Sequence, residues 1–261
     1  MAIGIKIVYL QPQDMEAEES PEIPLTLASG CLYVVATPIG NLDDMSARAI
    51  DTLRSVQTIL AEDTRSFKVL AARYGILTPV ISYHDHNEQG RTESLLPQLK
   101  GGASLALVSE AGTPGISDPG YRIVRACREA GVPVRGVPGA AAFLTALSVS
   151  GFEIDAFAFY GFLPQRPGKR RRTLEAILER PLTSVLYESP YKILSVVELI
   201  AEIQPTRELF VARELTKKFE EHISGTAIEV AKKLGTAKIR GEFVVVIRRA
   251  SESDAAETPE E

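Results

Sequence analysis

Short apolar runs alternate with amphipathic segments along residues 31–150. The apolar runs are rich in Val, Ile and Leu and end at turn-forming residues, which is typical of buried strands. The segments between them repeat apolar residues at helical spacing, as Ala49, Ile50 and Leu53 do after the N-cap candidate Ser46. This alternation predicts a mainly parallel sheet with right-handed crossovers. The predicted strands cover residues 32–36, 58–61, 79–82, 104–109 and 132–136, with helices after them, the last reaching residue 150.

The pattern changes after Gly151, where four of the nine phenylalanines fall in one strand-like stretch that ends at Leu163-Pro164. Strands close enough to pair antiparallel follow, so we expect a second α/β domain with a mixed sheet from residue 152. The elements predicted there are helices near 171–179 and 191–203 and strands at 183–187, 208–213, 219–224 and 242–248. The predicted division is an acidic, disordered extension at 1–30, domains at 31–151 and 152–250, and an acidic tail at 251–261.

Composition favours a globular cytoplasmic protein with no membrane partner. Hydrophobic residues make up 45% of the 261 residues, and no apolar run approaches the roughly 18 residues of a membrane span. The N-terminus lacks the basic start and long apolar run of a secretory signal. The two cysteines, Cys31 and Cys127, lie far apart without metal-ligand spacing, so we expect buried thiols and no metal site.

The net charge of −5 hides a basic body between two acidic ends. Residues 1–30 hold five acids and one base, and residues 251–261 hold five acids and no base. The 28 bases and 24 acids that remain give residues 31–250 a net charge of +4. A mildly basic body is compatible with an anionic partner but does not require one.

The segment from Ser109 to Gly120 is the first candidate for a ligand site. It follows a predicted strand and precedes a predicted helix, so it lies at the carboxyl edge of the sheet, where open α/β folds bind ligands. Its glycines allow a ligand to approach the backbone, and its prolines stiffen the path. An ordinary long connection is the alternative, but a twelve-residue loop without structure of its own is more often functional.

Two more turns are predicted at the same edge, at Thr37–Asn41 and Val137–Ala142. Small residues in the second turn would let a flat ring pack on the backbone, although Ala-rich helix starts also serve tight packing. Neither G-x-G-x-x-G nor G-x-x-x-x-G-K-[ST] occurs in the chain, which disfavours a nicotinamide or P-loop nucleotide site.

Two polar clusters are candidates for proton transfer. His84–Glu88 holds two of the three histidines, and it is either a general base or RNA-contacting loop or a solvated turn. Glu62–Arg65 lies at the end of a predicted strand. It is either a cluster of catalytic acids or a segment in which Asp63 or Thr64 only caps the next helix.

Five cations fall in the seven residues from Arg166 to Arg172. Pro167-Gly168 predicts a loop tip there. A run of cations is usually a solvated face, but repulsion among five like charges slightly favours an anionic partner such as nucleic acid.

Together these segments resemble the ribosomal RNA small subunit methyltransferase I family, within the tetrapyrrole-methylase-like superfamily. The resemblance covers about residues 31–248, and six blocks in the family's order make coincidence very unlikely. The blocks are Tyr33-Val34-Val35-Ala36-Thr37-Pro38-Ile39-Gly40-Asn41-Leu42, Ala61-Glu62-Asp63-Thr64-Arg65, His84-Asp85-His86-Asn87-Glu88, Ala111–Gly120, Gly161-Phe162-Leu163-Pro164 and Ala212-Arg213-Glu214-Leu215-Thr216-Lys217.

The resemblance implies 2′-O-methylation of a cytidine in the decoding region of small-subunit ribosomal RNA, free or in the 30S subunit or its precursor. It also implies S-adenosylmethionine as methyl donor, a homodimer, and a cofactor cleft between two α/β domains. The residues that match the superfamily's cofactor-binding loops are Pro38, Gly40, Ala111, Gly112, Thr113, Ile116, Pro138, Gly139 and Ala140, and Tyr187 is expected to add a contact.

Two positions depart from the family pattern. Glu110 stands where the family usually has aspartate, and Tyr191-Lys192 replaces the usual His-Arg, so the role of that histidine is not carried over. We expect His84, Asp63 or Glu62 to accept the proton of the ribose hydroxyl, and the sequence does not choose among them. The expected RNA-binding cations are Arg166, Lys169, Arg170, Arg171 and Arg172.

Two other functions stay open at this point. A tetrapyrrole methyltransferase of the same superfamily would share the cofactor loops but would not need the basic run. A non-catalytic RNA-binding or ribosome-assembly protein would keep the fold without binding the cofactor, which the glycine-rich loops disfavour.

Overall fold

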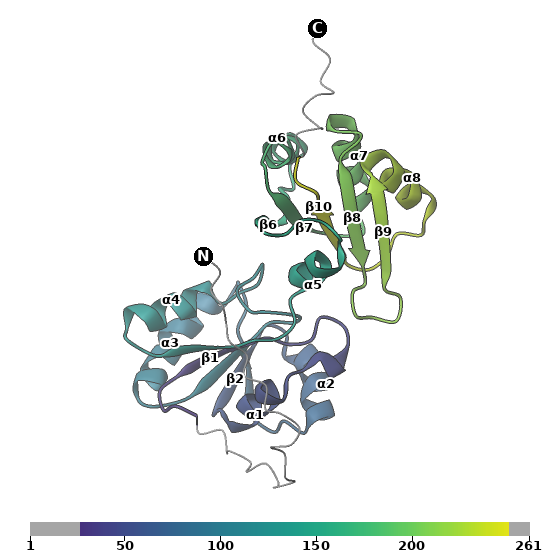
Figure 1. Cartoon of the computed structure of the whole chain (residues 1–261). Coiled ribbons are helices and arrows are strands. Elements are labelled where there is room, and N and C mark those ends of the chain that lie inside the picture. The colour runs from purple at the N-terminus through teal and green to yellow at the C-terminus, as the bar shows by residue number, and fades with distance from the viewer. Residues whose placement is uncertain (1–26, 251–261) are drawn as a thin grey trace, which may run out of the picture.

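The computed structural model describes residues 27–250, which form two five-stranded sheets, each with its own helices (Figure 1). The N-terminal sheet has the order β3-β2-β4-β1-β5, and all its neighbouring strands are parallel. The predicted parallel sheet is therefore confirmed. Its strands are β1 (Leu32–Val35), β2 (Thr58–Ala61), β3 (Val80–Ser82), β4 (Leu105–Val108) and β5 (Val134–Val137).

Helices cover both faces of the N-terminal sheet because successive strand residues point to opposite sides. Tyr33 and Val35 pack in one core cluster with α1 and α2, and Leu32 packs in the other with α3 and α4. The strands are thus buried on both faces, as expected of parallel strands. The elements are η2 (Leu42–Asp44), α1 (Ala47–Ser55), α2 (Thr64–Tyr74), α3 (Glu88–Lys100) and α4 (Tyr121–Glu129).

The C-terminal sheet has the order β6-β7-β10-β8-β9. Only the β6–β7 pair is parallel, and the other three pairs are antiparallel, which confirms the predicted mixed sheet. Its strands are β6 (Phe157–Phe162), β7 (Thr183–Glu188), β8 (Glu208–Arg213), β9 (Glu221–Thr226) and β10 (Phe243–Ile247).

Helices α6 (Pro167–Leu178), α7 (Ile193–Ile203) and α8 (Ala227–Thr236) cover one face of the C-terminal sheet. Helix α5 (Ala142–Val149) covers the other face, where Ala146 and Leu147 pack against Val185 and Val244. Helix α5 therefore packs on the C-terminal sheet although it precedes the predicted boundary at residue 152. The domain boundaries stay a prediction.

The structure corrects two expectations about local elements. The basic run is not a loop, because α6 begins at Pro167. Proline is favourable in the first turn of a helix, since the N–H that it lacks has no partner there. Helix α8 was not predicted, although a capping box marks its start. The Thr226 side chain accepts a hydrogen bond from the backbone N–H of Glu229, and the Glu229 side chain accepts one from the backbone N–H of Thr226.

Residues at both ends of the chain lie outside the part that the structure describes. Residues 27–30, predicted as part of the extension, pack on the N-terminal sheet, where Ala28 N donates to Tyr33 Oη at 2.9 Å and Gly30 N donates to the Gly102 carbonyl. The predicted disorder of the remaining extension and of the tail concerns residues 1–26 and 251–261, which lie outside the described residues.

Within residues 27–250, no helix is both long and apolar enough to cross a membrane. The same part of the chain holds no group of three or more His, Cys, Asp or Glu side chains arranged to bind a metal ion.

Candidate functional site

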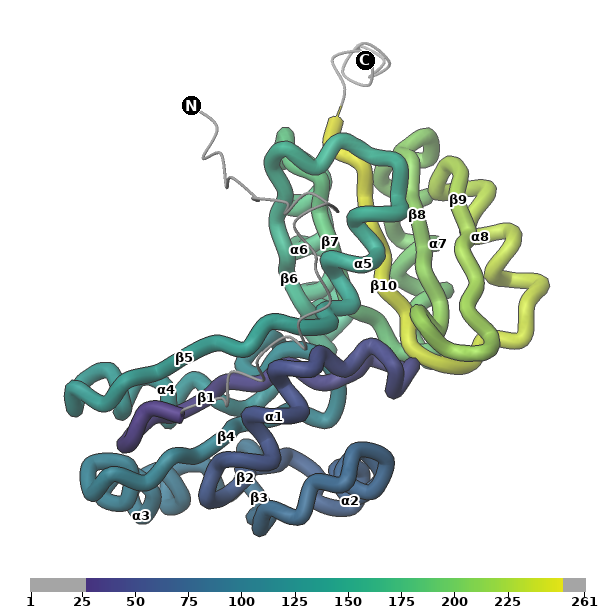
Figure 2. The backbone as a smooth tube through the Cα atoms, turned by 60° about the horizontal axis from the view of Figure 1, so that its bottom comes forward, coloured from purple at the N-terminus to yellow at the C-terminus, as the bar shows by residue number. Residues whose placement is uncertain are grey.

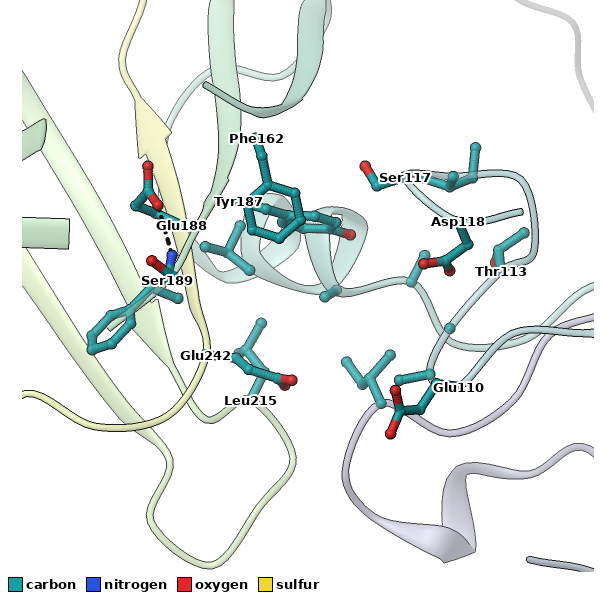
Figure 3. A pocket seen from close by; sticks show the side chains of 18 of the residues that line it. Glu110, Thr113, Ser117, Asp118, Phe162, Tyr187, Glu188, Ser189, Leu215 and Glu242 are labelled. Carbon is teal, nitrogen blue, oxygen red and sulfur yellow. Dashed lines mark hydrogen bonds between the residues drawn. The ribbon is translucent and has the colours of Figure 1, made fainter. Parts of the chain in front are cut away.

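The carboxyl ends of the parallel strands face the C-terminal sheet across a cavity of about 340 Å³ (Figure 3). This volume lies in the range of small-molecule binding sites. We call the cavity the cleft. It is lined by Ile39, Glu62, Glu110, Ala111, Gly112, Thr113, Ile116, Ser117, Asp118, Ala141 and Ala142 from the first half of the chain, and by Phe162, Tyr187, Glu188, Ser189, Pro190, Ala212, Leu215, Glu242, Phe243 and Val244 from the second.

Hydrogen bonds tie together the three loops that the sequence places at this edge. Thr37 N donates to the Gly112 carbonyl at 2.8 Å, and Gly112 N donates back to the Thr37 carbonyl at 3.1 Å. The hydroxyl of Thr113 donates to the Ala140 carbonyl at 3.1 Å. Gly112 has a φ of +85°, in the left-handed region that favours glycine, so the bridge to Thr37 depends on this residue type.

The loop after β1 also touches the loop between β8 and β9. Asn41 N donates to the Thr216 hydroxyl at 3.0 Å. A Cβ on Gly40 would lie 2.5 Å from Lys217 Cγ and 2.9 Å from the Leu215 carbonyl oxygen, so only glycine permits this approach. The contact joins the two sheets at the rim of the cleft.

Aromatic side chains form the side of the cleft contributed by the C-terminal sheet. The ring of Tyr187 lies against Phe159 and Phe162, with centroid distances of 4.9 and 5.8 Å, and its hydroxyl accepts a hydrogen bond from Phe143 N. Burial raises the pKa of Tyr187, which keeps the phenol neutral. The side chain of Phe162 is 57% exposed and offers a flat apolar surface at the cleft.

Carboxylates gather on the opposite side, where Glu62, Glu110 and Asp118 line the cleft. Burial and then repulsion by Glu62 raise the pKa of Asp118 to about 7. Burial also raises the pKa of Glu62, against the opposing effect of a hydrogen bond that it accepts from Glu110 N at 3.4 Å. This side of the cleft therefore suits a cation and holds a carboxyl that exchanges a proton near neutral pH.

The raised pKa of Asp118 predicts a pH-dependent stability. Native Asp118 keeps its proton up to about pH 7, whereas the unfolded chain loses it near 3.8, so stability falls as the pH rises between these values. We expect Asp118→Asn, measured by urea unfolding, to be about 2 kcal/mol more stable than the natural chain at pH 8, after discounting for partial exposure. The gain should be smaller at pH 5. A gain independent of pH would contradict the raised pKa.

Two further carboxylates belong to the second half of the chain. Glu188 is 5% exposed and accepts a hydrogen bond from Ser189 N at 2.8 Å. Glu242 pairs with Lys217 Nζ at 2.8 Å, and the same ammonium pairs with Glu214 at 2.9 Å. Lys217 therefore offsets one of the three negative charges at this end of the cleft.

The predicted cofactor-binding residues divide into two groups. Ala111, Gly112, Thr113, Ile116 and Tyr187 line the cleft. The others do not line it. Gly40 contacts the loop 215–217, Gly139 packs against Ala36, and Ala140 accepts a hydrogen bond from Thr113. Pro38 is buried and Pro138 is exposed.

Of the predicted proton acceptors, only Glu62 lines the cleft. Asp63 is the N-cap of α2 and accepts a hydrogen bond from Arg65 N at 2.7 Å, which lowers its pKa, so the capping alternative is confirmed. His84 lies near Glu62, whose pKa it lowers, and contacts Asn87 Nδ2 through Nε2 at 3.1 Å. Its buried Nδ1 has no hydrogen-bond partner among the described residues. The five basic residues at 166–172 lie outside the cleft, at the start of α6.

Sequence reasoning assigned a site role to six of the 21 lining residues, and its three candidate loops contain six more. Ile39, Ser117, Asp118, Phe162 and Leu215 lie within the segments that carry the family resemblance, so those motifs could have identified them. Glu242, Phe243 and Val244 lie outside every quoted motif, and the signal for them is absent from the local sequence.

Comparison with known proteins assigns the chain to a family. Residues 31–231 match the family described as Tetrapyrrole (Corrin/Porphyrin) Methylases. Ribosomal RNA small subunit methyltransferase I of Bacillus subtilis (strain 168) is 46% identical over 228 residues, which is 87% of this chain and 78% of that protein. The protein of the same name from Escherichia coli O157:H7 is 43% identical over 232 residues, covering 87% and 81% of the two chains. The chain belongs to the ribosomal RNA small subunit methyltransferase I family. The resemblance inferred from the motifs is confirmed.

This chain shares its fold with solved tetrapyrrole methylases. Uroporphyrin-III-C-methyltransferase from Thermus thermophilus superposes with a TM-score of 0.61 at 19% identity, over 88% of this chain and all of that chain. A second structure of that enzyme, complexed with S-adenyl homocysteine, gives a TM-score of 0.58 at 18% identity, over 82% and 96% of the two chains. At these identities the likeness establishes the fold alone.

Proposed function

We propose that the chain transfers a methyl group from S-adenosylmethionine to the 2′-hydroxyl of a cytidine in the decoding region of small-subunit ribosomal RNA. The observation that carries the proposal is the cleft, in which a glycine-containing loop and an aromatic wall enclose a group of carboxylates. The names of the family's members and the ligand of the solved tetrapyrrole methylase support the choice of substrate and donor.

The residues of the cleft fit this donor. Backbone groups at Ala111–Thr113 and the small side chains of Ala141 and Ala142 leave room for a nucleoside against the loops. Glu62, Glu110 and Asp118 provide negative potential that stabilises a sulfonium cation. When bound, the donor supplies an activated methyl group, and orientation within about 3–3.5 Å of the nucleophile is the main requirement for its transfer.

Asp118 is the proton acceptor that we assign to the ribose hydroxyl. It lines the cleft, and its pKa of about 7 leaves part of the population ionised and basic at neutral pH. A bound cation nearby would lower this pKa and increase the ionised fraction. Glu62 lines the same side and is the second candidate, whereas Asp63 is occupied as a helix cap.

The substrate is an anion, so the carboxylates of the cleft disfavour entry of its phosphates while admitting an uncharged ribose. The exposed ring of Phe162 at the cleft is suited to stacking of an unpaired base, which is how proteins hold nucleotides splayed from an RNA. The cations of α6 lie outside the cleft, where the RNA backbone would pass.

The proposal includes a homodimer that acts in the cytoplasm. Four large apolar side chains are exposed on and just after α5, namely Leu144, Val149, Ile154 and Phe157. Phe157 lies beside α5, with its ring 6.3 Å from that of Phe143. Large exposed apolar side chains are frequent at contacts between subunits, and they support the dimer.

The test is methyl transfer to small ribosomal subunits purified from cells that lack this protein, followed by mass mapping of the ribosomal RNA. We expect one methyl group on the ribose of a cytidine, binding of the donor by calorimetry, and a dimer by sedimentation. Uroporphyrinogen is the parallel substrate and should accept no methyl group. Methylation of a base, or of uroporphyrinogen alone, would overturn the proposal, and failure to bind the donor would favour a non-catalytic RNA-binding protein.

A further inference from the structure

A second cavity, of about 450 Å³, lies between α6 and β6, apart from the cleft. Three of its seven lining residues are basic and none is acidic, so we call it the basic cavity. It is lined by Tyr160, Lys169, Arg172, Thr173, Ala176, Ile177 and Arg180. Helix α6 lies beside β6, the edge strand of the C-terminal sheet, and its neighbour β7 (Figure 2).

Helical geometry brings the lining residues of α6 together. Positions 169, 172, 173 and 176 are spaced i, i+3, i+4 and i+7, so they share one face of the helix. Arg180 follows the end of α6, and its guanidinium carbon lies 5.8 Å from the centroid of the Tyr160 ring. The cavity therefore combines cations from within the basic run with one cation from outside it.

The cations of α6 fall into two groups that differ in their interaction partners. Arg170 donates to the carbonyls of Pro164 and Gln165, and Arg171 pairs with Glu175 and Glu202. These two arginines therefore stabilise the local structure. Across residues 27–250, by contrast, no carboxylate is recorded within ion-pair distance of the cations that line the basic cavity, which are Lys169, Arg172 and Arg180.

The hydroxyl of Tyr160 is closed off from the basic cavity. Its oxygen is buried and has no hydrogen-bond partner among the described residues, so a ligand in the cavity does not reach it. The ligand preference of the cavity comes from its three cations, which select an acceptor that carries negative charge.

The basic cavity and the cleft lie on opposite faces of β6. Tyr160 packs with the core cluster under α6, α7 and α8, whereas Phe162 contacts Tyr187, which packs with the cluster under α5. The strand is irregular between Phe159 and Phe162, which allows this change of face. Because β6 is the edge strand of the C-terminal sheet, an RNA backbone that leaves the cleft can pass this edge to reach the cavity.

We propose that the basic cavity binds a backbone phosphate of the substrate RNA, outside the cleft that the ribose enters. This inference rests on the proposed function and adds the surface that positions the RNA. It assigns phosphate binding to Lys169, Arg172 and Arg180 and a structural role to Arg170 and Arg171.

The test compares matched lysine variants of the full chain. Lys169→Gln removes a charge from the cavity, and Lys232→Gln removes the same charge from α8, which also packs on the C-terminal sheet. Binding of a labelled 12-nucleotide single-stranded RNA is followed by anisotropy at several salt concentrations. We expect Lys169→Gln and Arg180→Gln each to weaken binding about tenfold and to lower the salt slope by about 0.7, the value for one single-strand phosphate contact. Lys232→Gln should stay within about threefold.

Tyr160→Phe is a further control, because it keeps the ring beside Arg180 and removes only a hydroxyl that is closed off from the cavity. We expect its RNA binding to match that of the natural chain. A loss as large as that of Arg180→Gln would contradict the assignment of phosphate binding to the cations. Equal losses in Lys169→Gln and Lys232→Gln would overturn the proposal, because binding would then follow net charge and not the cavity.

Sodium tripolyphosphate separates this inference from the proposed function. It should compete with the RNA on the natural chain and bind Arg180→Gln about tenfold more weakly, whether or not the chain methylates RNA. Donor binding should be the same in all these variants. If tripolyphosphate binding depends on the cavity but RNA binding does not, the RNA assignment is wrong. If binding of tripolyphosphate and binding of RNA both depend on the cavity while no ribose is methylated, the phosphate-binding inference is supported and the proposed function is wrong.

Discussion

Asp118→Asn is expected to lower the single-turnover rate of methyl transfer about 100- to 1000-fold, the usual contribution of a general base. A ribose hydroxyl is a weak nucleophile, and the amide of asparagine cannot accept its proton. In the natural chain the rate should rise with pH and level off at or below about 7, because Asp118 must be ionised. In the variant this inflection should be absent. Rapid-quench measurements with saturating donor and small subunits, from pH 5.5 to 8.5, provide the test.

Glu62→Gln is the matched control, because Glu62 lines the same side of the cleft and its charge raises the pKa of Asp118. Removing this charge should move the inflection to lower pH and leave the maximal rate within about fivefold of the natural chain. If Glu62→Gln abolishes transfer while Asp118→Asn retains it, Glu62 is the base and the assignment of Asp118 is wrong.

Gly112→Ala is expected to weaken binding of the methyl donor about 30-fold. The φ of +85° at this position strains any residue with a Cβ, at a cost of about 2 kcal/mol. Relaxation of the strain would break the two hydrogen bonds that join Gly112 to Thr37 and would displace the loop that lines the cleft. Calorimetric titration with S-adenosylmethionine and with S-adenosylhomocysteine measures the effect.

Gly115→Ala provides the control in the same loop. Gly115 has a φ of +82°, but a Cβ there would meet nothing within 4 Å, and the residue does not line the cleft. Both variants should lose similar stability to urea, whereas only Gly112→Ala should lose donor affinity. Equal losses of affinity would mean that loop strain in general, rather than the bridge between Gly112 and Thr37, governs donor binding.

Most of the fold could be predicted because its signals are local. The strands of the N-terminal sheet follow from short apolar runs that end at turns, and the helices follow from apolar residues at helical spacing. The exceptions are instructive. Pro167 and Gly168 were interpreted as a loop tip, although proline also begins helices, and α8 was missed although Thr226 and Glu229 form its capping box.

The cleft could be predicted in part. Loops that follow parallel strands must meet at one edge of the sheet, so the sequence placed Gly112 and Thr113 beside the turns at 37–41 and 137–142. Asp63 shows the limit of this reasoning, because a carboxylate at a strand end and a helix cap have the same sequence signature.

By itself, the sequence determined the order of the elements, the two sheet types and the family, since periodicity, turn chemistry and motifs act over a few residues. Only the tertiary structure decided that Glu242–Val244 close the cleft and that α5 packs on the C-terminal sheet. It also decided the pKa of Asp118 and the division of the basic run into structural and cavity-lining cations. These properties depend on burial and on contacts between residues far apart in the chain, which no local pattern encodes.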